Sequence, residues 1–264
     1  MHSQGRPSAA GGQTMPTEIG IVQPVRTRRT PELGPLAVLA ASGQDVQLLR
    51  SRMNLPESRA LYLSRLYYNA AEQQAPCLVG PLMGAPYAVM CLETLRRWGV
   101  RKAFFIGWCG SINANVHIGD RVVPTTAWID EGTSIHYGQS AGGSVHPDHA
   151  LSAMLQHDLQ QHQIDFHAGA VWTTDAIYRE TPSRVLKFQG IGALTVEMEL
   201  SALFSAAAFY DFPLAGLLTV SDELFTFQWR PGFKSEAFER SRRITGDFFV
   251  ALLKRQSDEP DNEQ

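Results

Sequence analysis

The sequence predicts one α/β domain with a mixed, mostly parallel central sheet flanked by helices on both faces. Short apolar runs rich in β-branched residues alternate along the chain with segments in which apolar residues recur at helical spacing. Strands that alternate with helices pair mainly in parallel, and such sheets are covered on both faces. With 264 residues, of which 44 % are hydrophobic and 19 % charged, the chain has enough apolar material for one large core.

The first half of the domain contributes two predicted strands and one long helix. The run PLAVLA (35–40) is typical of a buried strand, and the glycine-containing turn SGQD follows it. Residues 85–99 have apolar positions at helical spacing, with Pro86 suited to the first turn and Gly99 to the C-terminal cap. The run KAFFIG (102–107) is too short for a helix and ends in glycine, which favours a second strand.

The second half continues the alternation. Strand-like composition appears in four further runs, 119–128, 169–178, 192–196 and 213–220. Helical patterns appear at 147–162, at ELSALFSAAAFYD (199–211) and from about 234 to 254. We therefore expect a folded domain at residues 34–254, preceded by a flexible tail at 1–33 and followed by an acidic tail at 255–264.

Composition excludes several classes of function. A formal net charge of −3 gives no reason to expect nucleic acid or an anionic membrane as partner, and no apolar run reaches the roughly 18 residues of a membrane span. The N-terminus lacks the apolar segment of a secretory signal, and the three cysteines form no CxxC pair, so we expect a soluble cytoplasmic protein with reduced thiols. His146 and His149 have a ligand-like spacing without a third ligand nearby, so no metal is expected.

Small and polar residues follow five of the strand-like runs. In chain order they are Gly43, Gly107 to Ser111, Thr173 to Tyr178, Glu197 to Glu199, and Ser221 to Glu223. Ligands of open α/β sheets gather at the carboxyl ends of the strands, so these residues outline a cleft.

Two acidic groups in this cleft attract attention. Glu197 and Glu199 flank Met198 at a strand-to-helix turn, where the helix dipole favours an ionised carboxylate that can accept hydrogen bonds from a vicinal diol such as ribose. Alternatively, both glutamates cap the helix and Met198 packs in the core. Asp222 is likewise open to a second interpretation, as an ordinary turn or cap aspartate.

Together these segments resemble the nucleoside phosphorylase superfamily, which includes purine nucleoside phosphorylase, uridine phosphorylase and related nucleosidases. The resemblance covers roughly residues 34–254. The matching segments, in the family's order, are LVGPLMGAP (78–86), GWCGSI (107–112), GDRVVPTTA (119–127), TTDAIY (173–178), VEMELSALF (196–204) and TVSDEL (219–224).

The resemblance implies roles for residues on the sugar and on the nucleophile side. Glu199 would hold the ribose hydroxyls, with Met198 and Met83 packed against the sugar. The phosphate or nucleophile side would comprise Gly43, Gly107, Trp108, Gly110 and Ser111, with Gly107 to Ser111 as a turn offering backbone N–H groups.

It also implies a base side with a general acid. Asp222 would protonate or hydrogen-bond N7 of a purine, with Ser221 orienting it, and a raised pKa would suit that task. Ile177, Tyr178 and Glu197 would line the base.

The chain departs from the family where phosphate binds. Phe105 and Gln47 occupy positions where the phosphorylases usually have arginines, and Trp108 replaces a small hydroxyl residue. Arg179, Arg230 and His136 are candidate anion contacts, or else solvated surface residues. The segment FTFQWRPGFK (225–234) has the composition of a lid or of a subunit interface.

The expected function is phosphorolysis of a purine nucleoside to free base and ribose 1-phosphate, with inorganic phosphate as co-substrate and no cofactor. Hydrolysis of the same bond by water is the alternative, because an anion buried without cations is costly. A non-catalytic nucleoside-binding protein is a second alternative. The family resemblance also implies a homo-oligomer with sites near subunit interfaces, acting in nucleoside salvage.

Overall fold

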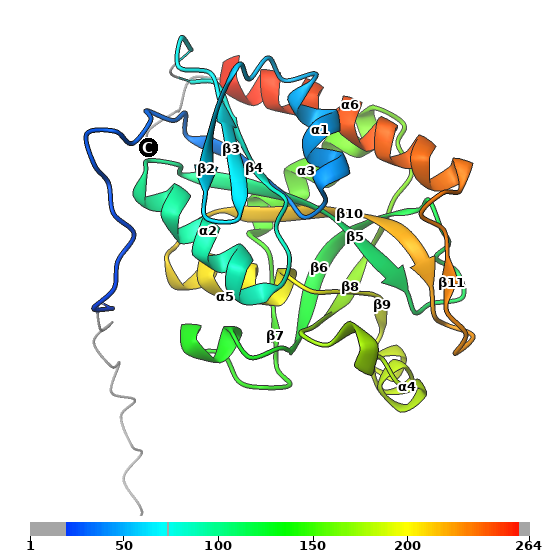
Figure 1. Cartoon of the computed structure of the whole chain (residues 1–264). Coiled ribbons are helices and arrows are strands. Elements are labelled where there is room, and N and C mark those ends of the chain that lie inside the picture. The colour runs from blue at the N-terminus through cyan, green and yellow to red at the C-terminus, as the bar shows by residue number, and fades with distance from the viewer. Residues whose placement is uncertain (1–19, 73, 259–264) are drawn as a thin grey trace, which may run out of the picture.

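Strands from the whole length of the chain join in one mixed sheet in the computed structural model, which describes residues 20–72 and 74–258 (Figure 1). The strands are β1 Leu36–Ala40, β2 Glu57–Leu61, β3 Ser64–Tyr68, β4 Cys77–Gly80, β5 Lys102–Ser111, β6 Arg121–Asp130, β7 Ser144–Val145, β8 His167–Thr174, β9 Ala193–Glu197, β10 Leu214–Glu223 and β11 Arg230–Pro231. The helices are α1 Gly43–Arg50, α2 Ala85–Arg97, α3 His149–Gln161, α4 Pro182–Gly190, α5 Leu200–Phe209 and α6 Glu236–Asp258, with 3-10 turns η1 Ser134–Tyr137 and η2 Ile177–Arg179.

Part of the sheet closes on itself. Strands β10, β6, β8, β9 and β5 pair in that order, and β5 pairs again with β10, which completes a ring. The ladders of β5 with β10 and of β6 with β8 are parallel, whereas β5–β9 and β10–β6 are short antiparallel pairings. From β5 the sheet extends outward through β1, β4, β3 and β2. The predicted mixed α/β sheet is thereby confirmed, with closure as an added feature.

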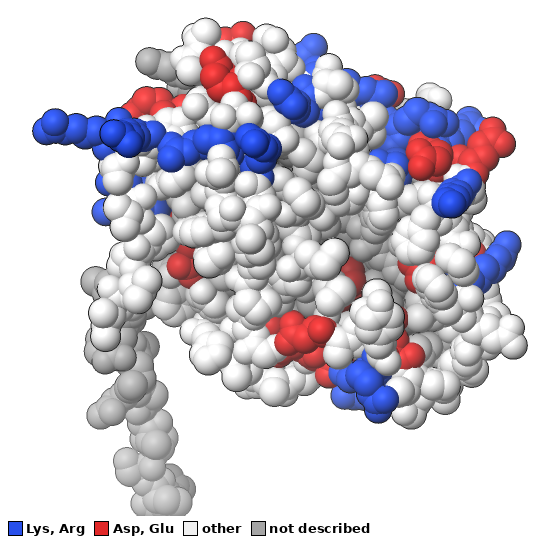
Figure 2. All heavy atoms as spheres, viewed as in Figure 1, with Lys and Arg blue, Asp and Glu red and all other residues white. Residues whose placement is uncertain are grey.

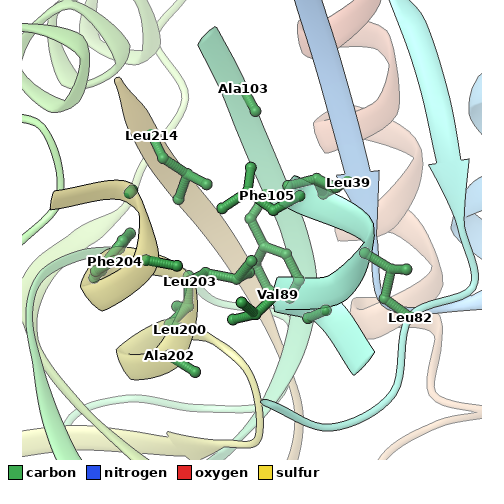
Figure 3. Close-up of a cluster of buried hydrophobic side chains, with 14 of the residues drawn as sticks. Leu39, Leu82, Val89, Ala103, Phe105, Leu200, Ala202, Leu203, Phe204 and Leu214 are labelled. Carbon is green, nitrogen blue, oxygen red and sulfur yellow. The ribbon is translucent and has the colours of Figure 1, made fainter. Parts of the chain in front are cut away.

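Helices cover both faces, as predicted. One apolar cluster packs α2 and α5 against β1, β5 and β10, and Figure 3 shows Phe105 between Leu39, Val89 and Leu203 in this layer. A second cluster packs α1, α3 and α6 on the opposite face. Because Phe105 is fully buried among these side chains, it belongs to the core and holds β5 in place.

Most predicted elements are confirmed, and two need correction. Strand β5 continues to Ser111, so the predicted turn at Gly107 to Ser111 is wrong: its backbone pairs with β10 instead. The predicted strand 169–178 ends at Thr174, and Ile177–Arg179 form a 3-10 turn. Short elements outside the predicted set are α1, the β2–β3 hairpin, β4 and α4.

The ends of the domain also differ from the expected boundaries. Helix α6 continues to Asp258, into the segment predicted as an acidic tail. Residues 20–33 contain no helix or strand, but Trp98 Nε1 donates a 2.9 Å hydrogen bond to the Val25 carbonyl and Arg59 donates one to the Arg29 carbonyl. This part of the expected tail therefore lies against the domain, while 1–19 and 259–264 fall outside the described residues.

On the face seen in Figure 2, Lys and Arg gather mainly in the upper part, in a band at the left and a patch at the right, whereas Asp and Glu occur in both the upper and the lower part. None of the helices in the described part of the chain is long and apolar enough to cross a membrane. Within the same residues, no cluster of three or more His, Cys, Asp or Glu side chains could hold a metal ion.

Removing the Phe105 ring should destabilise the fold. We expect Phe105→Ala to lower the free energy of unfolding by about 3–5 kcal/mol, because truncation of a fully buried aromatic leaves a cavity. Phe209→Ala is the matched control, since Phe209 is 40 % exposed and should lose less than half as much. Denaturant unfolding monitored by circular dichroism measures both; equal losses would show that Phe105 has no special place in the core.

Candidate active site

The candidate site lies where three strands of the ring meet. Gly110 on β5 pairs with Val196 on β9 and with Asp222 on β10, so the three residues lie side by side across the sheet. Glu197 directly follows Val196, and Thr173 on β8 pairs with Glu197. The register thus brings the two acidic segments predicted from the sequence to one edge.

Gly110 leaves the space that Asp222 occupies. A Cβ at this position would lie 2.4 Å from Leu224 Cδ1, 3.1 Å from Asp222 Oδ2 and 3.4 Å from Val196 Cγ1. The β5–β10 register shifts between Val220 and Asp222, and such bulges redirect the side chains next to them. The small residue and the bulge together position the Asp222 carboxyl.

Both oxygens of Asp222 have a donor. Ser221 Oγ donates to Oδ1 at 2.7 Å, and Trp229 Nε1 donates to Oδ2 at 2.9 Å. Burial raises the pKa of Asp222, while the two hydrogen bonds lower it. Ser221 is therefore placed to orient the carboxyl as predicted, and the contact from Trp229 is one that sequence reasoning missed.

A second carboxyl near Asp222 was also missed. Glu180, at the end of η2, has its pKa raised to about 8 by burial and by the charge of Asp222, with Arg184 acting in the opposite direction. Nothing in the local sequence signals this, because Glu180 follows three residues that are all exposed.

Glu197 caps helix α5. Its Oε2 accepts hydrogen bonds from the backbone N–H groups of Glu199 (2.7 Å) and Leu200 (2.8 Å), and Thr173 Oγ1 donates to Oε1. The capping alternative therefore accounts for the Glu197 carboxylate, and the predicted base contact finds both oxygens already bonded.

Glu199 lies beside the loop that precedes α2. The Gly84 N–H donates a 2.6 Å hydrogen bond to Glu199 Oε1, and the adjacent Met83 is 79 % exposed. Met198 is half-buried and belongs to none of the core clusters of the described residues, so the core interpretation does not describe it. Burial and the nearby charge of Glu197 raise the pKa of Glu199. The predicted sugar-side residues Met83 and Glu199 are thus brought together.

On the predicted nucleophile side the backbone is occupied. Gly107 has no room for a side chain, because a Cβ there would lie 2.6 Å from the Phe105 ring. Ser111 is fully buried, and its Oγ donates to the Val116 carbonyl at 2.6 Å, so it holds the loop after β5. Neither residue offers a free group to an anion.

A buried ion pair stands at this place instead. Trp108 Nε1 donates to Asp45 Oδ2 at 2.6 Å, and Arg242 Nε donates to Asp45 Oδ1 at 2.8 Å. Arg242 also lies over the Trp108 ring, with its guanidinium carbon 5.2 Å from the centroid. Burial raises the pKa of Asp45, and Arg242 and Trp108 partly oppose the rise. Gly43 begins α1, the helix that positions Asp45 in this group.

The predicted anion contacts do not join this group. Arg179 and His136 are exposed on η2 and η1, and Gln47 is exposed on α1. The Arg230 side chain is 74 % exposed and pairs with Glu223 at 3.1 Å. The buried cation beside Trp108 is Arg242, on α6, which the sequence interpretation did not select.

The predicted base contacts Ile177 and Tyr178 are exposed by 51 % and 96 %. They lie on η2, directly before Glu180 and hence near Asp222. A base bound at Asp222 could pack against the exposed side chains of Ile177 and Tyr178.

Residues 35–255 match the Phosphorylase superfamily. The chain belongs to this family. It is 30 % identical over 182 residues to a purine nucleoside phosphorylase DeoD-type of Bacillus cytotoxicus, which covers 66 % of this chain and 72 % of that protein.

Solved structures with similar folds include both phosphorylases and hydrolases. The uridine phosphorylase of Vibrio fischeri is similar with a TM-score of 0.73 and 20 % identity, covering 85 % of this chain and 94 % of that one. A futalosine hydrolase mutant of Helicobacter pylori is similar with a TM-score of 0.70 and 15 % identity, covering 84 % and 100 %. These structures share the fold, and the reaction has to be argued from the chain's own residues.

Adding a methyl group at Gly110 should impair the site. We expect Gly110→Ala to lower kcat/KM by at least about tenfold, because the new Cβ contacts Leu224 and the Asp222 carboxyl and a small displacement of a catalytic group is costly. Gly190→Ala is the control, since a Cβ there meets nothing within 4 Å. Steady-state kinetics of both variants measure the effect; unchanged kinetics in Gly110→Ala would mean that Asp222 tolerates displacement.

Proposed function

We propose that the chain cleaves the N-glycosidic bond of a purine nucleoside and that water is the attacking nucleophile. The observation that carries the proposal is a pair of carboxyls that each accept from an indole N–H, the half-buried Asp222 near the predicted base segment and the buried Asp45 beside Trp108 on the predicted nucleophile side. One can act as general acid and the other as general base, which is the arrangement that hydrolysis with inversion requires.

The acid acts on the leaving base. A buried carboxyl with a raised pKa retains a proton closer to neutral pH than an exposed aspartate does. As the bond from the sugar carbon C1′ to the base breaks, Asp222 passes its proton to N7 and the purine leaves neutral. A pyrimidine has no N7, so the placement of Asp222 favours a purine substrate.

The sugar would bind beside Glu199. The Glu199 carboxylate accepts from the Gly84 N–H, and its two oxygens have capacity for further hydrogen bonds, so it can also accept from a ribose hydroxyl. Met83 and Met198 supply polarisable surface next to it.

The nucleophile side favours water over phosphate. The Arg242 charge is already matched by Asp45, and a phosphate placed about 4 Å from the Asp45 carboxylate would be repelled by about 4 kcal/mol for each pair of unit charges at an effective dielectric constant of about 20. A water molecule has no such penalty. Its oxygen bonds to C1′, its proton passes to Asp45, and Trp108 and Arg242 hold the carboxylate in position.

Phosphorolysis, the leading prediction from the sequence, is the second candidate. Two observations favour it: the curated relatives at about 30 % identity carry phosphorylase names, and Arg242 is a buried cation on the nucleophile side. For phosphate to bind there, Arg242 would have to exchange Asp45 for the anion. A homo-oligomeric assembly and a cytoplasmic location remain predictions.

Product analysis distinguishes the two reactions. We expect purified protein to release base from inosine, adenosine or guanosine at the same rate with and without phosphate, with free ribose as product. Release that requires phosphate and yields ribose 1-phosphate would overturn the water mechanism and assign the anion to Arg242.

Asp222→Asn should lose at least about a hundredfold in turnover, the usual worth of a general acid.

Asp211→Asn is the matched control for that variant. Asp211 is exposed, and its positive φ of 50° is one that asparagine also adopts, so the exchange should leave turnover and folding unchanged. Full activity in Asp222→Asn would contradict the assignment of the acid and would favour a substrate whose base leaves without protonation.

A further inference from the structure

The hairpin between β10 and β11 carries a large exposed aromatic directly above the general acid. Asp222 on β10 pairs with Pro231 on β11, and the connection between the strands folds the Trp229 side chain back toward Asp222. The Trp229 residue is 64 % exposed, although its Nε1 lies 2.9 Å from Asp222 Oδ2. An exposed indole with a buried hydrogen-bond partner has a surface that a ligand can cover.

The oxygen that Trp229 occupies is the one best placed to serve a substrate. Asp222 Oδ1 is held by Ser221, whose hydroxyl also lies 3.2 Å from the Cys109 carbonyl within the sheet. Oδ2 instead lies beside Gly110, where a Cβ would be 3.1 Å away, and its donor is the exposed Trp229 indole. A base that takes a proton from Asp222 would therefore meet Oδ2.

The Trp229 N–H donates a hydrogen bond to Oδ2, whereas a protonated Asp222 would use Oδ2 to donate a hydrogen bond to the base. The indole N–H is a donor only, so it stabilises the carboxylate form of Asp222. A proton on Oδ2 that points at the base turns this oxygen into a donor. A base that accepts a proton from Oδ2 therefore competes with the indole N–H for this oxygen.

Aromatic rings connect Trp229 with Trp108. The ring centroids of Trp229 and Phe233 are 6.3 Å apart, and those of Phe233 and Trp108 are 6.0 Å apart. The two indoles that donate to Asp222 and Asp45 are consequently linked through one phenylalanine ring.

We propose that Trp229 is a positioning residue that holds the Asp222 carboxyl in the empty site and yields Oδ2 to the purine base when substrate binds. The inference rests on the proposed function, because it takes Asp222 as the general acid. The exchange breaks one hydrogen bond and forms another, so ground-state binding of the base is weakened by the bond that it displaces. Trp229 thereby contributes to selecting ligands that offer a hydrogen-bond acceptor to the protonated Asp222 carboxyl.

Other groups face Asp222 and enter the pH behaviour. They are the Glu180 carboxyl from the end of η2, which Arg184 approaches, and the Cys109 thiol from β5. The neighbouring Glu223 is engaged elsewhere, with the Ile118 N–H and Arg230. Because none of these contacts involves Trp229, a substitution there changes one partner of Asp222 and leaves the others in place.

The test is Trp229→Phe, which keeps an aromatic ring and removes the N–H. We expect KM for a cleaved purine nucleoside to fall by about three- to tenfold, the usual worth of one hydrogen bond, while kcat changes less than about twofold. The alkaline limb of the kcat/KM profile should move to higher pH, because Asp222 loses a donor that favours its charged form. Unchanged KM and an unchanged limb would overturn the proposal.

Trp128→Phe is the matched control, because Trp128 Nε1 has no hydrogen-bond partner among the described residues. It should leave both KM and the limb unchanged. In a binding experiment with free adenine, tryptophan emission should respond in the wild type and in Trp128→Phe, and lose most of this response in Trp229→Phe. A response that persists in Trp229→Phe would show that the base leaves Trp229 in place, against the proposal.

These results separate the inference from the proposed function. Loss of turnover in Asp222→Asn together with a Trp229→Phe enzyme that behaves like the wild type would overturn the role of Trp229 alone. Retention of turnover in Asp222→Asn would show that Asp222 is not the general acid, and it would overturn both the proposed function and the role of Trp229. A fall in kcat and in thermal stability of Trp229→Phe without a change in KM would assign the residue a merely structural role and would overturn the inference.

Discussion

The pairing of one residue, Gly110, with both β9 and β10 is the constraint on which the site depends. It closes the ring of strands at the edge where the chain changes from β9 into α5 and where β10 bulges before Asp222. Any side chain at this position would meet Leu224, Asp222 and Val196 together. The absence of a side chain therefore permits the strands to approach and leaves room for a carboxyl between them.

Burial of carboxyls is the second recurring feature. Asp222 and Asp45 lie on different elements, yet each is desolvated and each accepts a hydrogen bond from an indole N–H, of Trp229 and of Trp108. Desolvation raises the pKa of both groups, and the indoles limit the rise without adding a charge. The two carboxyls differ in one partner. Asp45 pairs with the Arg242 cation, which favours its ionised form, whereas no cation of the described residues forms an ion pair with Asp222. This contrast suits one group to act as base and the other as acid.

Much of the fold could be predicted because its long elements have clear periodicity. The helix at 147–162 and the strand at 35–40 were found nearly to the residue, as α3 and β1. The segment at Glu197 to Glu199 was correctly placed at a strand-to-helix junction, but the hydrogen bonds that make Glu197 a cap depend on Thr173 from another strand. Local pattern could not distinguish the two glutamates.

The nucleophile side could not be predicted for a related reason. Helix α1 spans only eight residues, and the ion pair of Asp45 is formed with Arg242, 197 positions away in the chain. The family resemblance places Phe105 where an arginine is usual, yet only packing shows that this ring fills the space beneath Gly107. Trp229 was seen as part of a lid-like composition, and its bond to Asp222 follows from the β10–β11 pairing that two short strands create.

The most direct test of the account is a crystal structure of the protein with a purine C-nucleoside, whose carbon–carbon glycosidic bond cannot be cleaved. We expect the ribose hydroxyls on the Glu199 carboxylate, the base within hydrogen-bonding distance of Asp222 Oδ2, and C1′ facing Asp45 and Trp108. A base bound away from Asp222, or a sugar that does not contact Glu199, would contradict the claim that the meeting of β9, β5 and β10 forms the active site.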